Sequence, residues 1–146
     1  MNFQATDKIT ILGMSGCGKS TLARKINKMW PRTIIIDPMR EQKDGFIFTE
    51  FSNFSKKMVE LKKENAKKFK VVFQFDPDSP DHDAIFNEIL RLGFHFKNLQ
   101  IYIDEVHLFS SPHFLPLYLK NNLFMGRHQG VSLMCVSQRP GSVNKA

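Results

Sequence analysis

Short runs of apolar, largely β-branched residues recur along the chain and alternate with segments whose apolar residues are spaced as on one face of a helix. The runs are nearly continuous in apolar content, which is typical of strands covered on both faces of a sheet. They predict strands at residues 8–12, 33–36, 70–75, 99–103 and 131–136, with a small additional strand at 45–49. The segments between them predict helices at 21–29, 52–68, 84–92 and 114–124.

The alternation of strands and helices predicts the fold class. Successive strands joined by helices form a mainly parallel sheet with helices on both faces, which is a three-layer α/β architecture. A length of 146 residues corresponds to one domain with one compact core. We therefore expect a single domain over residues 1–146.

The charge balance points to an anionic partner. The formal net charge is +7 at pH 7, and an excess of this size favours polyanions, nucleic acid first. Residues 55–70 contain seven lysines and two glutamates on a predicted helix. This helix either contacts DNA phosphates, which requires no particular base sequence, or presents an ordinary solvated face.

Composition also bears on the compartment. No apolar run approaches the roughly 20 residues of a membrane span, and residues 1–8 lack the features of a signal peptide. The two cysteines, Cys17 and Cys135, have no metal-ligand spacing and are expected to be reduced thiols. We expect a cytoplasmic protein, which for a viral protein means the host cytoplasm or the virion.

A phosphate-binding loop (Walker A) follows the first predicted strand. The pattern of two glycines, Lys and Ser is complete, and a predicted helix comes next. Glycines let backbone N–H groups surround an anion, the helix adds its positive end, Lys19 reaches the β- and γ-phosphates, and the Ser20 hydroxyl binds Mg²⁺. The predicted nucleotide-binding residues are Gly13, Met14, Ser15, Gly16, Cys17, Gly18, Lys19, Ser20 and Thr21.

Two acidic residues follow the predicted strand 99–103. Asp104 ends this apolar strand and is placed to hold Mg²⁺ together with Ser20 (Walker B), and Glu105 is placed to act as the base that activates water. The alternative for such a pair is a solvated acidic turn, but a phosphate loop upstream favours the catalytic interpretation. His107 completes a string similar to the DExH box of helicases, and we interpret it as a loop histidine.

A third polar element closes the predicted site. Gln138 follows the last predicted strand and can both donate and accept hydrogen bonds, which suits contact with the γ-phosphate or the attacking water. Arg127, or alternatively Arg139, is a candidate for an arginine finger acting on a neighbouring subunit. The alternatives are an ordinary strand end for Gln138 and surface positions for the arginines.

Together these pieces resemble the FtsK/HerA-type branch of P-loop ATPases, which includes viral genome-packaging ATPases. The resemblance rests on residues 13–20, 36–38, 101–105 and 126–131, and on Gln138-Arg139-Pro140. It implies a RecA/ASCE-like P-loop NTPase that uses ATP and Mg²⁺. It also implies a homo-oligomeric ring that moves or packages double-stranded DNA, with a viral portal or capsid protein as a further partner.

By the same resemblance, the catalytic residues would be Glu105, Lys19, Gln138 and Arg127, and the metal ligands Ser20 and Asp104. Such domains continue past the Gln-Arg-Pro element into another strand, whereas this chain stops at Ala146. We therefore expect a sheet without that last strand, in which the strand of the phosphate loop lies at the edge.

Two other functions fit the same loop. The first is a small-molecule kinase, in which Asp37 would bind the acceptor, although Asp104-Glu105 offers a hydrolytic base and no arginine-rich lid is evident. The second is a nucleotide-gated assembly module of the Zot type, which would bind ATP without turnover stimulated by DNA.

Overall fold

The computed structural model describes residues 2–14, 16–76, 79–110 and 115–138. Six strands form one sheet in the order β1-β6-β5-β2-β4-β3, and every neighbouring pair is parallel. The strands are β1 (Lys8–Leu12), β2 (Arg32–Ile36), β3 (Phe46–Phe48), β4 (Phe69–Phe73), β5 (Leu99–Ile103) and β6 (Val131–Ser137).

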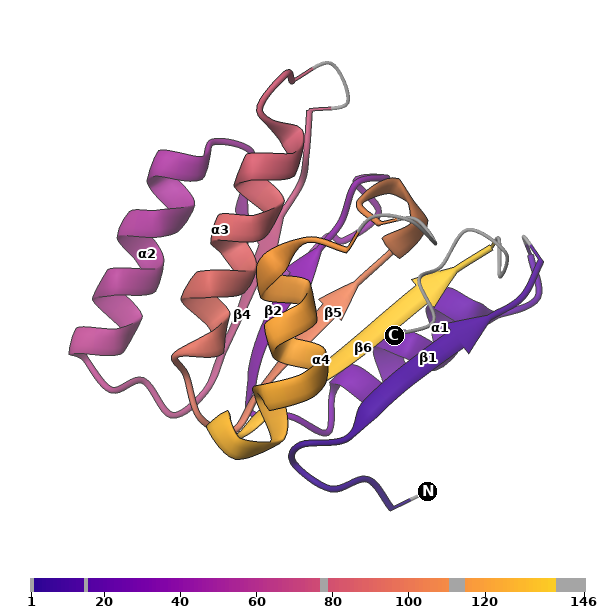
Figure 1. Cartoon of the computed structure of the whole chain (residues 1–146), viewed down its shortest axis with the longest axis horizontal. Helices are drawn as coiled ribbons and strands as arrows, with labels where there is room; N and C mark the ends of the chain where they lie inside the picture. The colour runs from indigo at the N-terminus through magenta and orange to yellow at the C-terminus, as the bar shows by residue number, and fades with distance from the viewer. Residues whose placement is uncertain (1, 15, 77–78, 111–114, 139–146) are drawn as a thin grey trace.

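Helices cover both faces of this sheet, but unequally. Figure 1 shows helices both in front of the sheet and behind it. The front helices are α2 (Phe51–Lys63), α3 (His82–Phe94) and α4 (Leu117–Gln129), and the helix behind is α1 (Lys19–Asn27). The predicted fold class, a three-layer α/β P-loop fold with a parallel sheet, is therefore confirmed.

Two apolar cores follow from this arrangement. The larger core joins the three front helices to the sheet through side chains such as Phe54, Ile89 and Ile101. The smaller core packs Ala23 and Ile26 of α1, together with Trp30, against the other face of the sheet. Because side chains alternate along a strand, Ile34 and Ile36 of β2 belong to the larger core and Ile35 to the smaller one.

Two helices differ by more than two residues from their predicted bounds. The prediction for α2 extended to residue 68, but the helix ends at Lys63, and Asn65 adopts a left-handed backbone with φ 49°. The prediction of a helix at 114–124 was too early. Pro116 is the N-cap of α4, and the helix runs on to Gln129, where Gly130 with φ 75° ends it.

The parallel strands place their carboxyl ends along one edge of the sheet. The phosphate loop follows β1, Asp37 follows β2, Asp104 follows β5 and Gln138 follows β6. Ligands of open α/β sheets bind at this edge, so the topology gathers the predicted site residues there. Among the described residues, β1 pairs with β6 alone and lies at the edge of the sheet.

Membrane insertion has no structural support in the described part of the chain, where no helix is both long and apolar enough to cross a bilayer. Both cysteines are free thiols, Cys17 exposed and Cys135 buried.

Candidate nucleotide-binding site

The phosphate loop connects β1 directly to α1. Its start is tied to the neighbouring strand, because the Gly13 N–H donates to the Ser137 carbonyl at 3.3 Å. Gly16 and Gly18 adopt positive φ angles of 79° and 86°, a left-handed conformation that glycine adopts without the strain a side chain brings. These two residues turn the chain sharply before α1 begins at Lys19.

Gly13 is required for a different reason: another part of the loop lies too close to position 13 to admit a side chain. A Cβ atom at this position would lie 2.7 Å from the sulfur of Cys17. The loop therefore folds Cys17 back over Gly13, and the thiol occupies the space that a larger residue at position 13 would need. This contact gives Cys17 a packing role within the loop.

The first turn of α1 is suited to binding an anion. It contains no acidic residue, and no side chain caps its N–H groups, so the positive end of the helix is not neutralised locally. Lys19 is only 8% exposed, and its Nζ donates to the Met14 carbonyl at 2.8 Å. A bound phosphate would take over this ammonium group from the loop backbone.

A cavity of about 370 Å³ opens in front of this turn. Its lining comes from the loop, α1, the segment after β2 and the ends of β5 and β6: Gly16, Gly18, Lys19, Ser20, Thr21, Met39, Glu41, Asp104, Glu105 and Gln138. The structure thus brings five of the nine predicted nucleotide-binding residues together with both predicted carboxylates and Gln138. Gly13, Met14 and Cys17 shape the loop behind the cavity, and Ser15 lies outside the described residues.

Asp104 sits at the base of the cavity with little access to solvent. It is 5% exposed, and its Oδ1 accepts the Glu105 N–H at 3.1 Å. Burial, and to a lesser extent the nearby carboxylates of Glu105, Glu41 and Asp37, raise the pKa of Asp104 to about 7. A carboxylate in such surroundings needs a cation to remain charged at neutral pH.

Glu105 and Gln138 are held together. Gln138 Nε2 donates to Glu105 Oε1 at 2.8 Å, which links the end of β6 to the end of β5. The other oxygen, Oε2, is buried and accepts no hydrogen bond from the described residues. Glu105 also has a left-handed backbone with φ 50°, a strained conformation for a residue with a side chain, and such strain often occurs at functional sites.

His107 is closer to this pair than the sequence indicated. It lies on the 3₁₀ turn Val106–Leu108, and its Nδ1 is 3.1 Å from both Glu105 Oε2 and Ser137 Oγ. The contact with Oε2 is an ion pair only when the imidazole is protonated. Spacing along the sequence does not reveal this contact, because it forms only when the turn after Glu105 folds back onto that residue.

Met39 and Glu41 also line the cavity and were not predicted. They reach it because Asp37, which is fully buried, accepts hydrogen bonds from the backbone N–H groups of Glu41 and Gln42 and from Gln74 Nε2. Asp37 therefore shapes the loop after β2.

Arg127, the first candidate arginine finger, does not line this cavity. Arg127 lies in the last turn of α4, next to the beginning of β6, whereas the phosphate loop is next to the end of that strand. Seven residues of β6 separate the two by roughly 20 Å. Arg139 lies outside the described residues.

The residues of the cavity fit a divalent cation. A serine hydroxyl and a buried carboxylate, Ser20 and Asp104, are oxygen donors of the kind that Mg²⁺ prefers, and both line the cavity beside Lys19. No cluster of three or more His, Cys, Asp or Glu side chains with metal-binding geometry occurs in the described ranges. A metal held here would therefore share its coordination with the phosphates of a nucleotide.

Comparison with known protein families gives one match. The model of the phosphoribulokinase/uridine kinase family matches residues 8–108, which include the phosphate loop, Asp104 and Glu105. No curated protein sequence matches the chain.

Solved structures with a similar fold include those of viral genome packaging NTPases. The genome packaging NTPase B204 from Sulfolobus turreted icosahedral virus 2, in complex with ATP-gammaS, superposes with a TM-score of 0.72 at 19% identity, covering 97% of this chain and 69% of that one. Its complex with AMP gives 0.68 at 20% identity, covering 97% and 70%. B204, the DNA-packaging ATPase from Sulfolobus turreted icosahedral virus, gives 0.57 at 22%, covering 92% and 67%. At such identities the similarity establishes the P-loop fold and does not single out the FtsK/HerA branch.

Proposed function

The chain belongs to the phosphoribulokinase/uridine kinase family of P-loop proteins, and we propose that it hydrolyses ATP and couples this reaction to the movement of double-stranded DNA. The observation that carries the proposal is the 2.8 Å hydrogen bond from Gln138 to Glu105. It fixes a carboxylate in the wall of the cavity that also contains Lys19 and Ser20. A base in that position serves hydrolysis, in which water is the acceptor of the phosphoryl group.

The phosphate loop would bind the triphosphate. The N–H groups of residues 16–21 and the ammonium group of Lys19 would surround the β- and γ-phosphates, and Lys19 would exchange its bond to the Met14 carbonyl for bonds to phosphate oxygens. The complexes of B204 with ATP-gammaS and AMP support a nucleotide as the ligand of this fold.

Ser20 and Asp104 would hold Mg²⁺. When bound, the ion would neutralise charge on the phosphates and on the buried carboxylate. Asp104 would then stay ionised at neutral pH, because the cation offsets the burial and the neighbouring carboxylates that raise its pKa.

Glu105 would act on the attacking water through Oε2. Its other oxygen accepts the hydrogen bond from Gln138, so the proton from water would go to Oε2, which lies 3.1 Å from His107 Nδ1. The oxygen of that water attacks the γ-phosphorus and ADP leaves, so the products are ADP and phosphate. Gln138 would hold the carboxylate in place and sense the γ-phosphate next to it.

DNA is the proposed partner because of charge. The exposed lysines on and after α2 include Lys56, Lys63 and Lys67, which make no ion pair with the described residues. Lys57 and Lys62 are engaged instead, with Glu60 and with the His95 carbonyl. The DNA-packaging activity named for B204 adds support for this partner through the shared fold.

Arg127 would act between subunits of a ring. Because it lies at the far end of β6 from its own loop, the nucleotide it could reach belongs to another copy. The same helix exposes Leu117, Phe124 and Met125, which would support contact with that copy. A viral portal or capsid protein is the further partner implied by a packaging role.

The test is release of phosphate from ATP with and without linear double-stranded DNA. We expect DNA to stimulate the wild type, and Glu105→Gln to lower turnover by roughly 10²–10⁴-fold while nucleotide binding is retained. Lys19→Ala should lose both binding and turnover. The exposed Glu50 provides a matched control, and Glu50→Gln should behave like the wild type.

Unchanged turnover in Glu105→Gln would contradict the hydrolytic assignment. Turnover that is unaffected by DNA would agree with ATP hydrolysis but contradict its coupling to the movement of DNA. Nucleotide binding with no turnover in an assembled oligomer would instead indicate a gated assembly module.

Phosphoryl transfer to a small molecule is the second candidate, favoured by the family match over residues 8–108. One feature weighs against the acceptor role expected for Asp37: its carboxylate is fully buried and already accepts three hydrogen bonds. Transfer of the γ-phosphate of labelled ATP to uridine or to ribulose phosphate, at a rate exceeding hydrolysis, would establish this alternative.

A further inference from the structure

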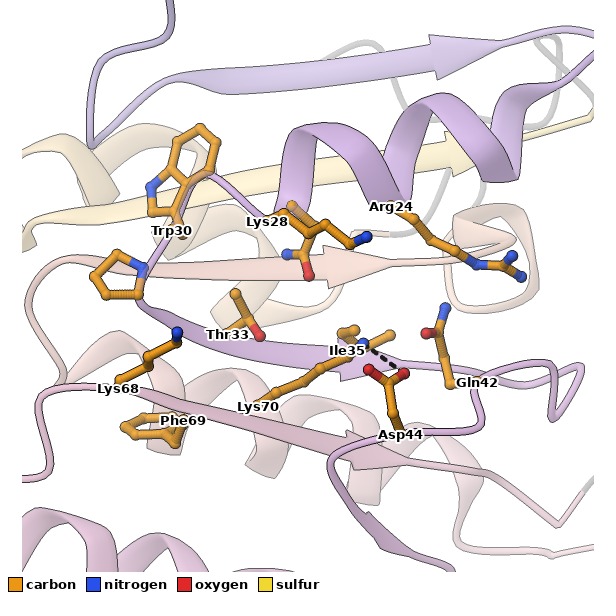
Figure 2. Close-up of a pocket in the computed structure, with 12 residues that line it drawn as sticks. Arg24, Lys28, Trp30, Thr33, Ile35, Gln42, Asp44, Lys68, Phe69 and Lys70 are labelled. Atoms are coloured by element: carbon orange, nitrogen blue, oxygen red, sulfur yellow. Dashed lines mark hydrogen bonds and ion pairs between the residues drawn. The ribbon is translucent and has the colours of Figure 1, made fainter.

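A second cavity, larger than the nucleotide cavity, lies on the α1 face of the sheet. It has a volume of about 570 Å³, and no residue that lines it also lines the nucleotide cavity. Figure 2 shows α1 along one side, β4 along the other, and β2 as the floor between them. We call this cavity the basic groove, after Arg24, Lys28, Lys68 and Lys70, which line it.

The groove exists because α1 packs over only part of its face of the sheet. Ala23 and Ile26 pack toward β1, β5 and β6, and beyond them Thr33 and Ile35 of β2 form the floor. The segment after β2 closes one end of the groove through Gln42 and Asp44.

The groove has an excess of positive charge. Lys70 Nζ is paired with Asp44 Oδ1 at 2.9 Å, and this hydrogen bond lowers the pKa of Asp44. Lys28 and Lys68 have no carboxylate within ion-pair distance among the described residues, and Arg24 only approaches Glu41 at 4.0 Å. Cations from both sides of the groove are therefore available to one anionic group.

The floor of the groove has polar groups without partners. Thr33 and Gln42 are 4% and 6% exposed, and neither side chain makes a hydrogen bond within the described part of the chain. Figure 2 shows Gln42 extending toward Arg24 from the loop after β2. Both side chains line the open cavity, so a hydroxyl and an amide are available to hydrogen-bond a ligand in place of water.

We propose that the basic groove binds a small phosphorylated molecule, a phosphate monoester attached to a compact body with hydroxyl groups. Lys28 and Lys68, from the two sides of the groove, would hold the phosphate, and Thr33 and Gln42 would hydrogen-bond the body. The volume lies within the roughly 300–1,000 Å³ of small-molecule sites and is too small to enclose a nucleic-acid duplex. This site is additional to the proposed ATPase activity and does not require it.

The chain contains its own reporter for this groove. Trp30 is the only tryptophan in the sequence, and it lines the groove. Its fluorescence can therefore be titrated with glycerol 3-phosphate in a Lys19→Ala background, which weakens phosphate binding at the nucleotide cavity. We expect a saturable change, with tighter binding of glycerol 3-phosphate than of inorganic phosphate.

Substitutions then assign the binding to the groove. Lys28→Gln combined with Lys68→Gln should weaken binding at least about tenfold, and Thr33→Val, which keeps the shape of a β-branched side chain, about threefold or more. Lys25→Gln is the matched control, because Lys25 is an exposed lysine of α1 that does not line the groove, and it should leave binding unchanged. Thermal melts check that each variant is folded.

Three outcomes would overturn the proposal. The first is the absence of a saturable change with glycerol 3-phosphate. The second is equal weakening by Lys25→Gln, which would mean that net charge alone attracts the ligand. The third is that single- or double-stranded DNA binds and loses affinity in the Lys28/Lys68 variant while glycerol 3-phosphate does not bind, which would make the groove a nucleic-acid surface. This experiment measures ligand binding and not ATP hydrolysis. A negative result would therefore contradict the groove proposal and leave the ATPase proposal untouched.

Discussion

On one face of the sheet, three helices pack against strands whose side chains on that side are apolar, from Ile34 and Ile36 to Val131 and Leu133. On the other face, α1 is the single helix of the described structure, and the strands carry Thr33, Gln100 and Ser132 among their apolar residues. The apolar packing on the first face stabilises the fold. The second face has less apolar burial and leaves room for the basic groove.

The polar residues of the α1 face are nonetheless ordered. Asn27 Nδ2 donates to Gln100 Oε1 at 2.7 Å, Gln100 Nε2 donates to Ser132 Oγ at 3.2 Å, and Ser132 Oγ donates to the Asp7 carbonyl at 2.6 Å. This chain of hydrogen bonds joins the end of α1 to β5 and β6. It replaces part of the apolar packing that a second helix would provide.

The largest difference between the two faces should appear when one side chain of the larger core is removed. Phe54 is fully buried, and its ring packs 5.6 Å from that of Phe73 and near Phe48 and Phe51. Phe54→Ala should lower the free energy of unfolding by about 3–5 kcal/mol, measured by urea denaturation. On the α1 face, Thr33→Val should change it by less than about 1 kcal/mol. Equal losses would mean that the faces contribute alike.

A somewhat smaller effect is expected from Asp104 in protein free of nucleotide and metal. Its pKa is raised from 3.8 to about 7, so the native state binds the proton more tightly than the unfolded state. The resulting stabilisation is complete below about pH 4 and is lost as the pH rises through 7. We therefore compare the free energy of unfolding of Asp104→Asn with that of the wild type. The difference should favour the variant by about 2–4 kcal/mol more at pH 8 than at pH 4.

Urea denaturation at the two pH values measures this difference, with Glu50→Gln as a control that should follow the wild type. Parallel pH dependences in Asp104→Asn and the wild type would show that Asp104 is not the group responsible.

Breaking this chain of hydrogen bonds should lower the free energy of unfolding by less than the changes above. Gln100→Leu leaves the amide of Asn27 and the hydroxyl of Ser132 without their partner, and we expect a loss of about 1–3 kcal/mol in the free energy of unfolding. The double variant Asn27→Leu/Gln100→Leu should lose less free energy of unfolding than the two single variants lose in sum, because both polar partners are then removed. A strictly additive result would contradict the coupling.

The smallest effect is expected at the surface of the same face. Arg24 Nη2 lies 4.0 Å from Glu41 Oε2, and both side chains are about half exposed. Such a pair is screened by water, so Glu41→Gln should change the free energy of unfolding by less than about 0.5 kcal/mol. A larger loss, seen in the same urea titrations, would show that this pair holds the loop after β2 against α1.

The strands could be predicted from the sequence because each is a local apolar run, and β1 and β5 have the predicted bounds. The order of the strands could not be predicted, because the position of β2 between β5 and β4 depends on contacts between distant segments. The predicted bounds of α4 were wrong because Pro116 precedes the first turn of the helix and Gly130 ends the last one.

The site shows the same division between local and distant information. The phosphate loop and Asp104-Glu105 are contiguous motifs, so their chemistry could be inferred from order alone. Glu41 reaches the cavity only through the loop that Asp37 organises, and no pattern reveals that path. The basic groove brings Lys28 and Lys68 together from positions forty residues apart.

The helix α1 lines both cavities, since Lys19 and Ser20 face the nucleotide cavity while Arg24 and Lys28 face the basic groove. Nine residues of helix form a body about 13 Å long that moves as a unit. If either ligand shifts α1, thermodynamic linkage requires reciprocity: the factor by which a groove ligand changes the affinity for nucleotide equals the factor by which nucleotide changes the affinity for the groove ligand. Titrating each ligand in the presence of the other measures this coupling free energy twice, by independent routes.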